Sequence, residues 1–420
     1  MKKIGLLFGT FALVALYSCS SDEVISQKDE AAIQTTQSIA FNPGVSKVTR
    51  STVYTPSSMF TSFKVAGYWN AVAPATYYVK GETLNPDPAP AAGAVYGAFT
   101  PGGLEIVSNN GAWDYKTQSE IQYWPFSATK SGDEITGYNC LALDFRAFAP
   151  ATSAPDYLNA DFAYTTPDAA SDMVDICYAY ADNKTNANSP IKMEFKHLFS
   201  QIIFKAKKAS NYVVDIKDIK IGGVGNNGTY AQSTLQGLTD AGILLTIDHT
   251  TTKSYAGFTS ASAISVPDQD ASASPYQITP ANQALLLLPQ TIEKWAHNGT
   301  SATESKQGYI AITYRAKKAG DDQWTTFVDA TNTPDGYKTV YYPLAAKWYS
   351  GKKYIYTLLF GGATDPDDTS SDPDNPDPGS DPGDNPGGYD DSGTPEPPSV
   401  PITFTASVLD WTEQIIDVSF

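Results

Sequence analysis

Short segments in which hydrophobic and polar residues alternate recur along this chain. Residues 63–69, 141–145 and 354–360 carry apolar residues at every second position. A period of two places these residues on one face of a β-strand. Turn-forming clusters of Gly, Asn and Pro separate such segments, at 101–103, 109–111 and 225–228. Because many short strands divided by turns are typical of sandwiches and barrels, the pattern predicts an all-β fold.

One segment carries two periods. Phe195, Leu198, Phe199 and Ile202 follow the i, i+3, i+4, i+7 spacing of a helix, yet the apolar residues after Ile202 alternate again as in a strand. A strand with a bulge near Leu198 accounts for both halves, and we prefer this interpretation to a helix.

Both ends of the chain also carry strand patterns. Residues 37–45 predict a short strand with Ile39 and Phe41 on one face, ended by a turn at 42–44. Near the C-terminus, spaced apolar residues predict a strand pair, namely Ile402, Phe404, Val408, Trp411, Ile416, Val418 and Phe420. Such a pair must bury its apolar face against another surface.

The first residues have the pattern of an export signal. Two lysines precede the apolar run 4–16, which is too short for a confident membrane-spanning helix. The sequence that ends at Cys19 resembles a bacterial lipobox, in which the cysteine is lipidated and becomes the new N-terminus. Residues 20–23 are similar to the acidic signal that sends lipoproteins to the outer face of the outer membrane. Secretion with cleavage nearby is the alternative.

Composition and charge agree with strands and add one unusual segment. Aromatic residues make up 12% of the chain, with 26 Tyr, and charged residues only 17%. Eleven acidic residues and no Lys or Arg lie between Asp365 and Glu396, so the remainder carries only −6 of the formal net charge of −17. No basic footprint for nucleic acid is present. Residues 363–400 predict an extended, mobile linker, and we prefer this to a Ca²⁺ site because no closing loop is present.

The sequence offers no carrier for catalysis. His197, His249 and His297 lie far apart, and none has a second His or Cys at the spacing of a metal site. His197 lies in an apolar strand and is interpreted as a hydrogen-bonded core residue. We therefore expect no enzymatic activity, no cofactor and no metal. Cys140 and Cys177 are left either as a disulfide or as two buried thiols.

A series of short motifs along the chain resembles one known family. They are Val48-Thr49-Arg50-Ser51-Thr52, Phe63 to Tyr68, Tyr123-Trp124-Pro125, Asp144 to Pro150, Phe195-Lys196-His197, Leu288-Pro289-Gln290, Trp348 to Gly351 with Tyr354 to Tyr356, and Val408 to Trp411. Their order after the lipobox resembles that of the fimbrillin-like lipoproteins that build the type V pili of the Bacteroidia.

This resemblance implies a fold of two tandem transthyretin-like β-sandwich domains. It also implies that an arginine-specific, trypsin-like protease cuts between Arg50 and Ser51 and removes the strand with Ile39 and Phe41. A neighbouring pilin subunit then adds a strand in its place, and residues 401–420 are the candidate donor. The protein would move from a lipid anchor in the outer membrane to a fimbrium that serves adhesion and biofilm formation.

The predicted division of the chain is a signal peptide at 1–19, a pro-segment with the removable strand at 20–50, a first sandwich at 51–185, a second at 186–362, the acidic linker at 363–400 and the C-terminal strands at 401–420. The boundary near 185 rests on residues 181–190, where apolar residues vanish. The alternative function is a non-polymerising surface lipoprotein that binds glycan or host protein. The linker is longer than the resemblance implies, so the last strands could also stay in their own domain.

Overall fold

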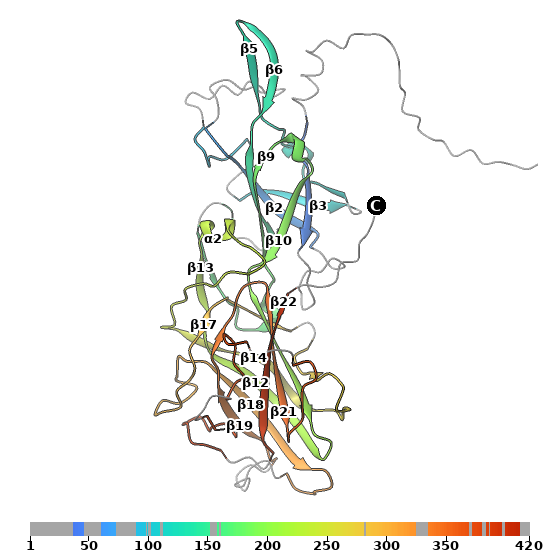
Figure 1. The fold of residues 1–420 in the computed structure, drawn as a ribbon, viewed down its shortest axis with the longest axis vertical. Coiled ribbons are helices and arrows are strands. Elements are labelled where there is room, and N and C mark those ends of the chain that lie inside the picture. Colours follow the sequence, from blue (N-terminus) through green and yellow to red (C-terminus); the bar gives the residue numbers. More distant parts are fainter. Residues whose placement is uncertain are drawn as a thin grey trace, which may run out of the picture.

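The computed structural model describes most of residues 37–411. The gaps lie at 46–59, 73–89, 98, 100–101, 110–111, 152–157, 159–160, 281–282, 325–334, 369–371, 380–383, 386 and 397–399. The molecule is elongated, with one group of strands stacked above another along its long axis (Figure 1). Among the described residues, no helix is both long and apolar enough to cross a membrane.

The upper group contains a seven-stranded sheet in the order β1-β10-β9-β7-β2-β3-β4. The strands are β1 (Phe41–Val45), β10 (Ile191–His197), β9 (Cys177–Lys184), β7 (Leu143–Ala149), β2 (Ser62–Trp69), β3 (Leu104–Asn109) and β4 (Ala112–Tyr115). Neighbours are antiparallel except β1 and β10, which run parallel. One apolar core, which includes Phe63, Phe145 and Phe195, packs against this sheet.

The lower group contains two sheets that share a second core. One has the order β15-β11-β21-β22 with β16 beside β11, and the other β14-β12-β18-β19. Their bounds are β15 Tyr276–Gln277, β11 Ser200–Lys208, β21 Lys352–Phe360, β22 Ile402–Asp410, β16 Leu285–Leu287, β14 Thr252–Ser265, β12 Tyr212–Gly225, β18 Tyr309–Lys318 and β19 Lys338–Pro343. Aromatic side chains join the sheets, for example Tyr314 with Phe360 and Tyr342 with Phe404.

Three strand pairs and a few short helices complete the described fold. The pairs are β5 (Phe126–Ser131) with β6 (Glu134–Cys140), β8 (Phe162–Thr165) with β13 (Asn227–Tyr230), and β17 (Thr291–Ile292) with β20 (Ala346–Lys347). The helices are α2 (Gln232–Gln236) and three 3₁₀ turns at Gln118–Glu120, Ala170–Asp172 and Asn186–Asn188. The β5–β6 hairpin projects from the upper end of the molecule (Figure 1).

The predicted all-β fold is confirmed, and so are the strands predicted from alternation. They correspond to β2, β7 and β21. The segment around Leu198 is also a strand on both sides, but the expected bulge is instead a passage between sheets. β10 ends at His197, and β11 begins at Ser200 in a different sheet. Leu198 and Phe199, which form the passage, are both buried.

This passage moves the border between the two groups of strands. β9 and β10 are neighbours in the upper sheet, so the predicted boundary at 185/186 falls on the short connection between two of its strands. The polar stretch 181–190 contains the end of β9 and the tight turn at Asn186–Asn188, whose polar side chains face solvent. The chain enters the lower sheets only after His197.

The acidic segment 363–400 is not the free linker that its composition predicts. Tyr389 is 2% exposed and exchanges two backbone hydrogen bonds with Tyr341 of β19, at 2.9 and 3.0 Å. His297 stacks on the Tyr389 ring at a centroid distance of 4.2 Å. The backbone of Asp374 accepts a hydrogen bond from Lys347. The described parts of this segment therefore pack on the lower sheets, because scattered aromatic and Asn residues supply anchors that a composition count does not reveal.

Candidate functional site

The first strand lies at the edge of the upper sheet. β1 pairs in parallel with β10, and Phe41 lies opposite Ile191 and Val45 opposite Phe195. The strand runs through residues 42–44, which the sequence predicts to end it as a turn. Pro43 fits there because an edge strand needs no ladder hydrogen bond on its outer side.

Ile39 and Phe41 are core residues, as their alternation predicts. They are 1% and 5% exposed. The Phe41 ring makes edge-to-face contacts with Phe63, Tyr115 and Phe145 at centroid distances of 6.2, 6.3 and 5.5 Å. A cavity of about 60 Å³ lies beside them. Removal of this strand would therefore uncover an apolar slot and the ladder groups of β10.

The last described strand, β22, lies at the edge of a lower sheet and pairs antiparallel with β21 along its whole length. Ile402 and Phe404 are buried, and Val408 packs partly buried against the same core. The acidic segment covers the outer edge of β22, because Asp377 Oδ1 accepts a hydrogen bond from the Ala406 N–H at 2.7 Å. In this structure, β22 thus fills its own domain.

A cluster of polar side chains lies where the two groups of strands meet. His197 ends β10, and its Nδ1 lies 2.7 Å from Asp175 Oδ2 and 3.4 Å from Cys177 Sγ. The His197 ring stacks on Trp411 at a centroid distance of 4.2 Å. His197 is thus the hydrogen-bonded core residue that the sequence predicts.

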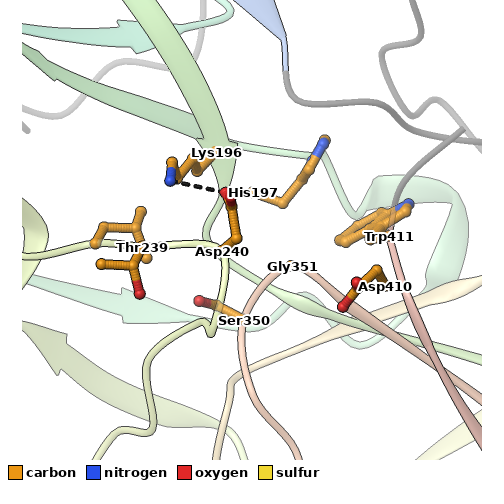
Figure 2. Close-up of a pocket in the computed structure, with 9 residues that line it drawn as sticks. Lys196, His197, Thr239, Asp240, Ser350, Gly351, Asp410 and Trp411 are labelled. Atoms are coloured by element: carbon orange, nitrogen blue, oxygen red, sulfur yellow. Dashed lines mark hydrogen bonds and ion pairs between the residues drawn. The ribbon is translucent and has the colours of Figure 1, made fainter. Parts of the chain in front are cut away.

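A cavity of about 130 Å³ opens beside His197 and Trp411 (Figure 2). At its rim, the Lys196 Nζ lies 2.8 Å from the Asp240 Oδ1. This hydrogen bond and the Lys196 charge lower the pKa of Asp240. The rim pair is exposed on the Asp240 side and contributes little to stability.

Cys140 and Cys177 do not form a disulfide in this structure. Cys140 Sγ accepts a hydrogen bond from the Asn186 N–H at 3.3 Å, whereas Cys177 is turned toward Asp175 and His197. Burial raises the pKa of both thiols, and the Asp175 charge raises that of Cys177 further. Of the two interpretations, the structure has free thiols.

Several residues predicted to function lie outside the described part of the chain. These are the lipidation residue Cys19, the cleavage pair Arg50 and Ser51, and the last apolar positions Ile416, Val418 and Phe420.

Sequence reasoning missed the neighbours of His197. A separation of twenty residues hides Cys177, but the two residues are directly opposite in the antiparallel register of β9 and β10. The tight turn between two alternating strands was the signal that could have placed them together.

Comparison with profiles of known protein families gives a match over most of the chain. The profile described as fimbrillin-like matches residues 98–371. The chain belongs to the fimbrillin-like family. This agrees with the all-β fold and with the order of the short motifs. No curated protein matches the sequence.

Solved structures with similar folds include fimbrial and adhesion proteins. A crystal structure of a fimbrial protein from Bacteroides vulgatus shares 14% identity, covers 77% of this chain and 94% of its own, and gives a TM-score of 0.45. A candidate cell adhesion protein from Bacteroides uniformis shares 12% identity, covers 89% and 98%, and gives 0.38. At these values the likeness carries no weight for the function of this fimbrillin-like chain.

Proposed function

We propose that this fimbrillin-like protein is a structural or tip subunit of a cell-surface pilus that assembles by loss of its first strand. The protein is exported, lipidated at Cys19 and held at the outer membrane. An arginine-specific, trypsin-like protease cuts after Arg50, β1 leaves, and a strand of another pilin subunit takes its place. The pilus serves adhesion to a host or bacterial ligand and biofilm formation.

The observation that carries this proposal is the position of β1. β1 has β10 as its one neighbouring strand, so its departure breaks a single ladder of the sheet. The residues just before β1 also exchange two backbone hydrogen bonds with Gln122 and Trp124, and these must break as well. Burial of Ile39 and Phe41 stabilises the contact by roughly 1.5–3 kcal/mol per side chain, so an incoming strand with similar residues would recover this energy. Main-chain hydrogen bonds to β10 would add grip and register.

The C-terminal segment 401–420 is the candidate donor, with Ile402, Phe404 and Val408 as the residues that would fill the slot. For donation, β22 must leave β21 and break the hydrogen bond to Asp377. This complete pairing favours a second candidate, a subunit that keeps its last strand. Such a protein would be a pilus end component or a non-polymerising surface lipoprotein that binds glycan or host protein.

Limited trypsin treatment tests the proposal. We expect a discrete cut after Arg50, release of the segment that carries Ile39 and Phe41, and oligomers that resist unheated SDS. The matched control is Arg50→Ala, which should stay uncut at this position and monomeric. If the cut protein stays monomeric at high concentration, it is not a polymerising structural subunit, and the second candidate is favoured.

Deletion of residues 401–420 separates the two roles of the last strand. If the cut protein folds but no longer assembles, these residues are the donor. Misfolding of the deletion variant, followed by circular dichroism, shows instead that β22 is required in its own domain.

A further inference from the structure

Three different metal-binding side chains converge at the junction between the two groups of strands. Asp175, Cys177 and His197 are 0%, 0% and 3% exposed, and their ligand atoms all lie within 4.8 Å of one another. The Sγ atom lies 3.4 Å from the His197 Nδ1 and 3.8 Å from an Asp175 oxygen. The carboxylate oxygens lie 2.7 and 2.9 Å from Nδ1.

The backbone builds this cluster directly. Asp175 lies two positions before Cys177, the first residue of β9, and the side chains of both residues reach the same point. His197 is the residue opposite Cys177 in the antiparallel register. Two neighbouring chain segments therefore present the three ligands to one point.

Hydrogen bonding alone leaves this cluster incomplete. The Nδ1–H of His197 can satisfy the Asp175 carboxylate, but the Cys177 thiol then has only a long contact to the same carboxylate. The buried His197 Nε2 has no hydrogen-bond partner among the described residues, and a metal on Nδ1 would leave that atom as it is. In the part of the chain that the structure describes, no Lys or Arg forms an ion pair with Asp175. The opposite charge beside its carboxylate must therefore come from His197 or from a bound cation. A buried carboxylate without such a partner is costly.

We propose that Asp175, Cys177 and His197 bind a zinc ion. Thiolate, imidazole and carboxylate are the ligands that zinc prefers, and Zn²⁺ would neutralise one carboxylate and one thiolate beside a neutral imidazole. Normal zinc–ligand bonds in a tetrahedral arrangement separate the sulfur from the other two ligand atoms by about 3.5 Å, and nitrogen from oxygen by about 3.3 Å. The two sulfur distances agree within a few tenths of an ångström, and the Nδ1–oxygen distance must widen by about half an ångström.

Binding requires two proton shifts. The Cys177 S–H proton leaves to solvent and the sulfur becomes a thiolate. The hydrogen on the His197 Nδ1 moves to Nε2 by tautomerisation, so the imidazole stays neutral and offers its Nδ1 lone pair. Three protein ligands leave a fourth position for water. The ion would hold Cys177 of β9 to His197 of β10, whose ring stacks on Trp411, the residue that follows β22. Zinc would thus strengthen the junction on which the end of the last strand rests.

Metal content and a cobalt spectrum test this site. The full chain is produced in medium with zinc or with cobalt, purified, and passed through a weak chelator. We expect about one metal per chain by mass spectrometry and, with Co²⁺, a thiolate-to-cobalt charge-transfer band in the near ultraviolet. Removal of zinc with a strong chelator should lower the unfolding midpoint by several degrees.

Matched cysteine variants locate the signal. Cys177→Ala should lose the band and the bound metal, whereas Cys140→Ala and Cys19→Ala should keep both. Asp175→Asn should keep the band but bind zinc at least tenfold more weakly. A folded chain without a thiolate band overturns the proposal, and so does a band that persists in Cys177→Ala. If Cys177→Ala does not fold, the spectrum of the unchanged chain together with the two cysteine controls decides.

Discussion

Truncation of Phe41 measures how firmly the first strand is held. The side chain is 5% exposed and touches three aromatic rings of the upper core. Replacement of a buried Phe by Ala costs about 3–5 kcal/mol, which includes the cavity that it leaves. β1 has only one neighbouring strand, so this loss should act first on detachment of β1 and only then on unfolding of the whole sheet.

Hydrogen exchange at one amide reports this detachment. The Ile191 N–H of β10 donates to the Ala40 oxygen at 2.8 Å and is protected only while the first segment is in place. A loss of 3–5 kcal/mol corresponds to roughly a 10²- to 10³-fold or greater increase in opening. We therefore expect the Ile191 amide of Phe41→Ala to exchange faster by at least about a hundredfold, unless global unfolding already limits it.

The matched control lies next to it in the same strand. Asn42 is exposed, so Asn42→Ala should change the free energy of opening by less than about 0.5 kcal/mol. If Ile191 exchange in Phe41→Ala rises less than tenfold above this control, the aromatic contacts do not hold β1, and the reasoning behind the removable strand is wrong.

Two further predictions concern the lower sheets. Gln290 is fully buried, and its side-chain amide forms hydrogen bonds with both the N–H and the C=O of Gly225. Gln290→Ala should therefore lower the free energy of unfolding, measured by urea titration, by about 2–4 kcal/mol. The control Gln277→Ala, at an exposed position, should lower it by less than about 0.5 kcal/mol. Burial, and secondly the Asp368 charge, raise the pKa of Asp377 despite its bond to Ala406. The folded chain therefore binds this proton more tightly, and stability falls as the pH rises through the folded pKa. Asp377→Asn should gain stability over the unchanged chain at pH 7 but not near pH 3, and an equal difference at both pH values would contradict this.

Alternation of apolar residues was enough to predict β2, β7 and β21, because a sheet with a buried face imposes a period of two. Phe63 and Val65 in β2, and Tyr354 and Tyr356 in β21, are buried as this period predicts. The other face of β21 is also buried, which the alternation does not show. The burial of Ile39 and Phe41 was equally visible. Alternation does not show which strands pair with one another. Neither the neighbour of β1, which is β10, nor their parallel register could therefore be predicted.

The wrong predictions share one cause, which is the use of local composition for a long-range question. The polar turn before β10 has the composition of a linker, yet both of its strands lie in one sheet. The acidic segment has the composition of a free chain, but single anchors such as Tyr389 fix it to distant strands. The cluster at His197 likewise depends on a register between strands that no single segment specifies.

The direct passage from β10 to β11 has a mechanical consequence. Only Leu198 and Phe199 connect the two strands, and both side chains are buried. The connection at this waist, the junction between the upper and lower groups of strands, is therefore short and tightly packed. Bending at this waist must pull apolar side chains out of the core at about 25 cal/mol for each Å² exposed. The protein should therefore behave as a stiff rod, and a filament built from it would flex where one subunit meets the next.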